Sequence, residues 1–332
     1  MQYNKWSWQI LGCLCLGMAF SFLGSLCSLQ GSVNLCFTES EPKIKVVTTS
    51  TDLKAMAEAI GGDKLEIFSL AKGNQDLHFI EPKPSQIIKL SQAQLFIRLG
   101  LGLDNWCEPL IKKAHNPNID IGSEGYLDAS QGVKIIEVPL PDSVPADKKR
   151  ELHIYGNPHY WLSPANGKVM IENICAALVK IAPQEADFFE KNKDEYLAKL
   201  DKEIKQWQKK IKPYQGTKVV TYHKSWTYFL DFFGFEESGV IEPKPGIPPS
   251  PKHLAALIKF IKDEEVKLVL VEPFYSEKAP KMLAKETGAD VLVLPTSVDA
   301  DKGINTYIEV FDHMIDKLIQ TLSKDKENKE ND

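Results

Sequence analysis

The sequence predicts an α/β protein of two lobes, each with a mainly parallel sheet flanked by helices. Short apolar or β-branched segments alternate with segments of helical periodicity from residue 45 onward. Residues 183–213 interrupt this alternation with apolar residues at helical spacing amid dense Lys and Glu, and the alternation then starts again. We therefore expect one long helix that joins two lobes, with a cleft between them.

In the first lobe the same two patterns predict each element. Ser50 or Thr51 can cap the first helix, and Pro84 stands early in the second helix, where its missing N–H costs little. Residues 115–133 are polar and rich in turn residues. The predicted strands are 45–50, 66–70, 94–100 and 133–138, and the predicted helices are 52–60, 84–90, 103–114 and 163–181.

The joining segment fits one amphipathic helix of about 30 residues and about 45 Å. In the second lobe the predicted strands are 218–222, 239–241, 266–272 and 290–294, and the predicted helices are 226–233, 251–263, 277–287 and 304–322. The predicted organisation is a signal peptide or membrane anchor with a linker (1–42), a first lobe (43–182), a linking helix (183–214), a second lobe (215–322) and a disordered tail (323–332).

The N-terminal segment is expected to direct export. Between Trp6 and Thr38 there is no charged side chain, and Lys5 precedes an apolar run from Ile10 to Leu26. This pattern is typical of a secretory signal peptide or an uncleaved anchor. We therefore expect a periplasmic or other extracytoplasmic protein, with membrane attachment through this segment as an open alternative. The net charge of −5 and the absence of a basic cluster argue against a nucleic-acid partner.

Four of the six cysteines lie in or just after the N-terminal segment. Lipidation is an open alternative, although neither candidate cysteine matches a lipoprotein signal well. Cys27 follows a bulky Leu where such signals carry a small residue, and the apolar run before Cys13 is short. Cys107 and Cys175 remain for the folded body. An exported compartment permits a disulfide between them, and two buried free thiols are the alternative.

Three histidines, His78, His159 and His223, stand in equivalent turns between a predicted strand and a predicted helix. In parallel sheets, ligands bind at the carboxyl ends of strands, where Glu272 also falls. Imidazole is the commonest nitrogen ligand of zinc and similar ions, and three histidines with a carboxylate or a water complete a tetrahedral shell. These positions therefore predict a metal site. The other histidines, His115, His153, His253 and His313, are interpreted as ordinary surface or helix residues.

Four stretches carry a resemblance to a known family: 73–85 (GNQDLHFIEPKPS), 156–164 (GNPHYWLSP), 222–229 (YHKSWTYF) and 271–274 (VEPF). In this order they resemble the zinc- and manganese-binding substrate-binding proteins of bacterial ABC transporters, the ZnuA/TroA-like group. The resemblance covers nearly the whole chain from Lys45 to Leu322. It implies two α/β lobes joined by a long backbone helix, a metal ion in the interlobe cleft, and delivery of that ion to a membrane permease.

The resemblance places the family's first three ligands on His78, His159 and His223. Manganese-binding members usually have Glu in the third position, so His there resembles the zinc-binding branch and favours Zn²⁺ over Mn²⁺. Asp299 is the preferred fourth ligand, although it is offset from the family's position by a few residues. Glu272 and a water are its rivals.

The neighbours of these residues are expected to shape the site. The aromatic residues Trp161, Trp226, Tyr160 and Phe274 are predicted to pack around the cleft and limit water there. Asp76 and Glu81 are predicted to be solvated or to orient His78.

The expected function is a monomeric receptor that binds one Zn²⁺ or Mn²⁺ as its transported ligand, hands it to an ABC permease, and is not an enzyme. One alternative is an exported zinc-dependent hydrolase, in which the same histidines activate a water. It needs a substrate-sized cleft and a general base, for which Glu272 is the candidate. A metal-dependent surface adhesin is a further alternative and is compatible with the receptor. We expect metal release by local loop motion, because a single long helix resists wide hinge bending.

Overall fold

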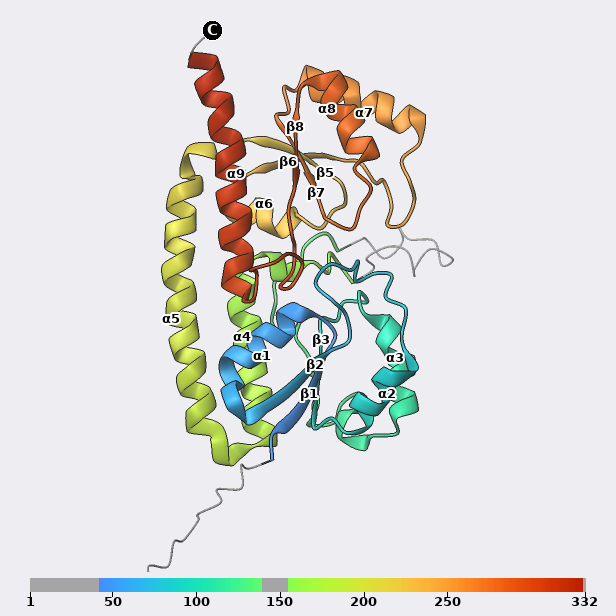
Figure 1. Ribbon diagram of the computed structural model, residues 1–332, viewed down its shortest axis with the longest axis vertical. Coiled ribbons are helices and arrows are strands. Elements are labelled where there is room, and N and C mark those ends of the chain that lie inside the picture. The colour runs from blue at the N-terminus through green and yellow to red at the C-terminus, as the bar shows by residue number, and fades with distance from the viewer. Residues whose placement is uncertain (1–41, 139–154, 331–332) are drawn as a thin grey trace, which may run out of the picture. The chain divides into compact units, whose positions relative to one another are not determined.

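A computed structural model describes residues 42–138 and 155–330, which fall within one compact unit. The predictions for the N-terminal segment, for His153 and for most of the loop before Asn157 lie outside the described residues. Figure 1 shows two α/β lobes with two long helices, α5 and α9, running side by side along them. The predicted fold class is confirmed.

The first lobe contains a four-stranded parallel sheet in the order β2-β1-β3-β4. Ser50 caps the first helix, because its side chain accepts a hydrogen bond from the Leu53 N–H at 3.2 Å. The strands are β1 (Ile44–Thr48), β2 (Leu65–Ser69), β3 (Leu95–Arg98) and β4 (Tyr126–Asp128), and the helices are α1 (Thr51–Gly61), α2 (Pro84–Ser91), α3 (Glu108–Ala114) and α4 (Pro164–Ile181).

The fourth strand of this lobe is β4, in the segment interpreted as polar and turn-rich, and the prediction of a strand at 133–138 is wrong. Tyr126 pairs with Phe96 of β3, and Gly125 permits the approach, because a Cβ there would lie 2.3 Å from the Gln94 carbonyl oxygen. The Ile136 N–H instead donates to the Tyr228 hydroxyl of the second lobe at 3.2 Å. A three-residue strand is too short for periodicity to reveal.

The second lobe repeats the arrangement with a parallel sheet in the order β6-β5-β7-β8. The strand β7 is fully buried, as its apolar sequence predicted. The strands are β5 (Lys218–Thr221), β6 (Glu236–Val240), β7 (Leu268–Val271) and β8 (Asp290–Val293), and the helices are α6 (Thr227–Phe233), α7 (Pro251–Asp263) and α8 (Lys278–Thr287).

The joining helix is α5 (Ala186–Ile211), which has 26 residues with a 3₁₀ turn at each end. It does not act alone, because α9 (Tyr307–Glu330) packs along it. Trp207 of α5 stacks on Phe311 of α9 with ring centroids 5.2 Å apart and donates to the Asp312 carboxylate at 2.8 Å. Two packed helices make a stiffer connection than the single helix that was expected.

The last helix also extends further than predicted. It continues to Glu330, whereas the sequence was interpreted as ending the helix at Leu322 and leaving 323–332 as a disordered tail. Residues 323–330 contain no apolar side chain, so no apolar period in the sequence marks the final turns of α9. Lys and Glu nevertheless have good helix propensity, which explains the continuation. The domain boundaries themselves stay predictions.

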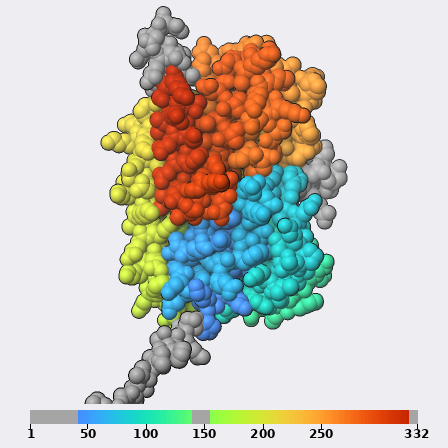
Figure 2. All heavy atoms as spheres, in the orientation of Figure 1, coloured from blue at the N-terminus to red at the C-terminus, as the bar shows by residue number. Residues whose placement is uncertain are grey.

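One hydrophobic core passes from the first lobe into the second. It joins Leu53 of α1 and Trp161 to Trp226 and Phe311. Figure 2 shows the second lobe (orange to red) resting directly on the first (blue to teal), with α5 beside both. This shared core lets the cleft close into a small cavity.

The two cysteines of the folded body are both buried free thiols. Cys107 lies in a cluster with residues of α2 and α3, and Cys175 lies in the core that both lobes share. Of the two alternatives left open by the sequence, the structure has the free thiols. Within 42–138 and 155–330, no helix is long and apolar enough to cross a bilayer.

Candidate metal centre

The structure brings His78, His159 and His223 together. One candidate ligand atom from each residue lies within 4.8 Å of the other two. The ring centroids are 5.1 Å apart for His78 and His159, 5.1 Å for His78 and His223, and 5.2 Å for His159 and His223. Such nearly equal separations surround one point, which suits a single ion.

Each histidine lies in a loop between a strand and a helix. His78 lies between β2 and α2, His159 comes directly before a 3₁₀ turn that leads into α4, and His223 lies between β5 and α6. His159 and His223 are only 3% and 2% exposed, and the His78 side chain is 14% exposed. The group is therefore largely shielded from water, which strengthens electrostatic interactions within it.

His78 and His159 are held by the same local arrangement. Asp76 Oδ1 accepts hydrogen bonds from the His78 backbone N–H at 2.9 Å and from its ring Nδ1 at 2.7 Å. Asn157 Oδ1 does the same for His159, at 3.0 and 2.9 Å. Because Nδ1 carries the proton in such a bond, Nε2 becomes the ligating nitrogen in a metal complex.

The orientation of the Asn157 amide is fixed by its other contacts. Its Nδ2 donates to the Lys224 carbonyl oxygen at 2.8 Å and to Glu137 Oε2 at 2.9 Å, so Oδ1 must face His159. Lys224 follows His223 directly. One amide therefore orients His159 and also ties down the loop that carries His223.

His223 is supported from a distant part of the chain. Its Nδ1 pairs with Glu242 Oε2 at 2.7 Å, and Glu242 Oε1 accepts from the Gly246 N–H at 2.8 Å. Burial lowers the pKa of His223 and outweighs the opposing effect of the Glu242 hydrogen bond. The imidazole is thus neutral at neutral pH, the form that binds metals.

Asp76 is ionised beside its histidine. Burial by itself would raise the pKa of the Asp76 carboxyl, but hydrogen bonds and the charge of His78 lower it below the usual value. The prediction that Asp76 orients His78 is confirmed by its two hydrogen bonds, whereas Glu81 is exposed.

The structure does not bring Asp299 to the three histidines. Asp299 is exposed, has a φ of 60°, and lines a separate depression with Lys54 and Lys72. Its backbone N–H donates to the Ile304 carbonyl oxygen at 2.9 Å, which closes a turn in this loop. Thr296 and Ser297, from the same loop, line the histidine cavity instead.

Glu272 lies at the carboxyl end of β7 but does not join the histidines either. It is fully buried. Burial raises the pKa of Glu272 to about 8, although Ser225 and Trp226 beside it act in the opposite direction. Among the described residues, no carboxylate belongs to the group of ligand atoms that the histidines form.

The cavity at the histidines is small. Its volume is about 10 Å³, which leaves room for one water or one ion. Trp161 and Phe274 line it as predicted, and Trp161 Nε1 donates to the Thr296 carbonyl oxygen at 2.9 Å. Tyr160 and Trp226 are fully buried. The other lining residues are Gln75, Asp76, Leu77, Ser225, Tyr275 and Ser297.

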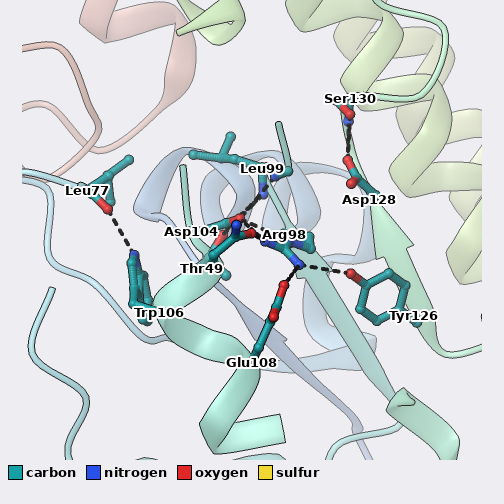
Figure 3. Close-up of polar contacts among 12 residues, drawn as sticks. Thr49, Leu77, Arg98, Leu99, Asp104, Trp106, Glu108, Tyr126, Asp128 and Ser130 are labelled. Carbon is teal, nitrogen blue, oxygen red and sulfur yellow. Dashed lines mark hydrogen bonds and ion pairs between the residues drawn. The ribbon is translucent and has the colours of Figure 1, made fainter. Parts of the chain in front are cut away.

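A buried ion pair in the first lobe fixes the segment after β3. Figure 3 shows Arg98 paired with Asp104, with N–O distances down to 2.8 Å, while the Leu99 N–H donates to Asp104 at 2.7 Å. From this segment Trp106 Nε1 donates to the Leu77 carbonyl oxygen at 2.8 Å. The Leu99 carbonyl oxygen accepts from the Tyr160 hydroxyl at 2.7 Å. The backbone is therefore anchored beside both His78 and His159.

Three residues that support the histidines or Asp76 by hydrogen bonds were not predicted: Asn157, Glu242 and Tyr275. Asn157 had a local signal, because Asp-Leu-His and Asn-Pro-His place the same kind of side chain two residues before each histidine. Glu242 lies 19 residues from His223, and Tyr275 lies 199 residues from Asp76, to which it bonds. No sequence spacing could have indicated either contact.

Several known proteins are similar to this chain over most of its length. The chain is 28% identical over 327 residues to the manganese ABC transporter substrate-binding lipoprotein PsaA of Streptococcus pneumoniae, covering 95% of this chain and 99% of PsaA. It is 27% identical over 326 residues to the high-affinity zinc uptake system protein ZnuA of Bacillus subtilis (strain 168), covering 96% and 98%. A crystal structure of ZnuA matches with a TM-score of 0.72 and 26% identity, covering 84% of this chain and 99% of that one. The family model for ZnuA, the periplasmic component A of the zinc-uptake complex, matches residues 46–321, and the chain therefore belongs to this family.

Proposed function

We propose that this protein is an extracytoplasmic receptor that captures one divalent transition metal ion with His78, His159 and His223. The observation that carries the proposal is the convergence of three ligand atoms within 4.8 Å in a cavity that admits one ion. Tetrahedral zinc with Zn–N bonds of about 2.0–2.1 Å places its nitrogens about 3.3 Å apart. A small inward shift of the three rings reaches that geometry.

The donor set favours Zn²⁺ over Mn²⁺. Imidazole suits zinc, whereas manganese prefers carboxylate, carbonyl and water oxygens. The three histidines have no carboxylate among their ligand atoms in the described residues, and their supports already engage Nδ1. We propose a water as the fourth ligand, with the hydroxyls of Ser225, Thr296 and Ser297 lining the same cavity.

A hydrolase fits this site poorly. The cavity has room for an ion or a water but not for a scissile bond with its flanking groups. Glu272, the candidate base, is fully buried and is not among the residues that line the cavity, so it is poorly placed to activate a water there. Capture of an ion is the chemistry that this enclosure favours.

We further propose that the captured ion passes to an ABC permease. PsaA is named as a substrate-binding lipoprotein of such a transporter, and ZnuA of Bacillus subtilis (strain 168) as a zinc uptake protein. The charge pattern of residues 1–42 supports export, and the segment's cleavage or attachment is part of this proposal.

Calorimetric titration of the full, metal-free chain with Zn²⁺ and with Mn²⁺ tests the proposal. We expect sub-micromolar Zn²⁺ binding that weakens on acidification, because protonated imidazole cannot bind a metal. Binding should be lost when all three histidines are changed to Ala. His253→Ala is the matched control, since His253 lies outside the site and bonds to the Val240 carbonyl oxygen. Unchanged binding by the triple variant would overturn the site, and tighter binding of Mn²⁺ would overturn only the metal preference.

A further inference from the structure

Tyr275 is anchored in the second lobe beside the metal site. Its backbone N–H donates to the Glu272 carbonyl oxygen at 3.1 Å, in the turn that follows β7. Its ring stacks on that of Tyr222, with centroids 4.3 Å apart and an interplanar angle of 13°. Tyr222 directly precedes His223. The ring is therefore held against the chain segment that carries one histidine.

The hydroxyl of Tyr275 reaches a residue that holds a different histidine. It donates to Asp76 Oδ2 at 3.2 Å, while Asp76 Oδ1 accepts from the backbone N–H and the ring Nδ1 of His78. Asp76 belongs to the loop after β2 in the first lobe, and its side chain is 16% exposed. One carboxylate thus ties His78 on one side to the second lobe on the other.

This hydrogen bond couples the loop that carries His78 to the turn that follows β7, two segments from different lobes. When the second lobe moves away at Tyr275, Asp76 loses one of its two anchors, and the support of His78 becomes less rigid. While the bond is formed, the hydroxyl fixes the carboxylate and thereby the ring of His78. A ligand held in a fixed rotamer loses less conformational entropy on binding a metal.

We propose that Tyr275 is a positioning residue for the metal: its hydroxyl acts through Asp76 to hold His78 in the ligating orientation, and the bond must break before the ion leaves. This inference rests on the proposed function, because it assigns a regulatory contact to the same site. It predicts an effect on the release of the ion more than on its capture, because a bond that must break before the ion leaves adds to the barrier for release.

Stopped-flow release of Zn²⁺ to a chelating dye tests the inference on the full chain. Tyr275→Phe keeps the ring and its stacking but removes the hydroxyl, and it should raise the dissociation rate about tenfold, as expected for a partly shielded hydrogen bond to a charged group. The association rate should change by less than about twofold. Tyr222→Phe is the matched control, because it removes a neighbouring hydroxyl that is not bonded to Asp76, and its release rate should equal that of the unmodified protein.

A second background separates positioning from general destabilisation. In Asp76→Ala, the hydroxyl has no carboxylate to hold, so adding Tyr275→Phe should change the release rate by less than about twofold. An equally large effect in that background, or unchanged release in Tyr275→Phe alone, would overturn the inference while leaving the receptor in place. Absence of Zn²⁺ binding by the unmodified protein would instead overturn the proposed function, and this inference with it.

Discussion

The two lobes hold their histidines in different ways. In the first lobe, His78 and His159 are each oriented by a side chain two residues earlier, and the same oxygen accepts from the backbone and from the ring. In the second lobe, His223 is oriented by Glu242, which lies 19 residues further along the chain. The first arrangement is local, and the second depends on the sheet.

Pairing between β5 and β6 creates the second arrangement. The ladder continues past the strands, because the Ile241 N–H donates to the Thr221 carbonyl oxygen and the Glu242 N–H to that of Tyr222, both at 2.8 Å. This parallel continuation sets Glu242 beside His223. A local turn can orient a ligand as soon as the segment bends, whereas His223 becomes oriented only when the sheet has formed.

The largest effect on this difference between the lobes is expected from a change of Glu242, which supports His223. Glu242→Ala removes the acceptor of His223 and also frees the Gly246 N–H, so we expect Zn²⁺ affinity to fall about 100-fold, at the upper end for a residue that supports a ligand. Calorimetry on the metal-free protein measures this. Glu236→Ala, at an exposed position on β6, is the control and should leave affinity unchanged. Equal losses of Zn²⁺ affinity in Glu242→Ala and Glu236→Ala would show that β6 affects binding only through the folding of the lobe.

A smaller loss is expected from the local support of His159. Asn157→Ala should lower Zn²⁺ affinity about tenfold, because a neutral amide oxygen makes a weaker hydrogen bond than a carboxylate does. Asn157→Asp restores the acceptor but not the bond from Nδ2 to the Lys224 carbonyl oxygen. Recovery of Zn²⁺ affinity in Asn157→Asp would show that the loss in Asn157→Ala comes from the missing support of His159. No recovery would assign the loss to the missing bond between Asn157 and the Lys224 carbonyl oxygen. Both are measured by the same titration.

The buried groups of the second lobe predict opposite dependences of stability on pH. Burial raises the pKa of Glu272 from 4.5 to about 8. The stability that this difference contributes is therefore fully present below pH 4.5, the pKa of the unfolded chain, and is lost as the pH rises towards 8. Burial lowers the pKa of His223 from 6.5, so the contribution of the neutral ring to the stability of the fold is lost as the pH falls below 6.5.

Glu272→Gln should therefore stabilise the metal-free protein more at about pH 8.5 than at about pH 5, because it removes a carboxyl that is costly to ionise in a buried site. The free energy of unfolding in urea at the two pH values measures the difference. A matched change at an exposed carboxyl, Glu264→Gln, should change the free energy of unfolding by the same amount at both pH values. A loss of stability in Glu272→Gln at the higher pH would contradict the assignment of a buried protonated carboxyl.

The smallest effect is expected at Asp299. Because this side chain is exposed and lies outside the histidine cavity, Asp299→Ala should change Zn²⁺ affinity by less than about twofold. Titration of the variant beside the unmodified protein is sufficient. A loss comparable to that in Asn157→Ala would mean that the loop swings Asp299 into the site when the metal binds.

Most elements could be predicted because their patterns are long. The α7 bounds, Pro251–Asp263, agree with the prediction, since Ser250 and the proline mark the start and the apolar period marks the buried face. β4 could not be predicted, because it consists of three residues defined by pairing with β3. The final turns of α9 have no apolar residue in the sequence to mark them.

The sequence by itself determined the two α/β lobes, the long joining helix and the three histidines at the ends of strands, because periodicity and motifs are properties of neighbouring residues. Only the tertiary structure decided which groups surround these histidines. Glu242 reaches His223 through strand pairing, Tyr275 reaches Asp76 across the cleft, and Asp299 lies outside the histidine cavity. Contacts between residues distant in sequence arise from packing, which no local pattern records.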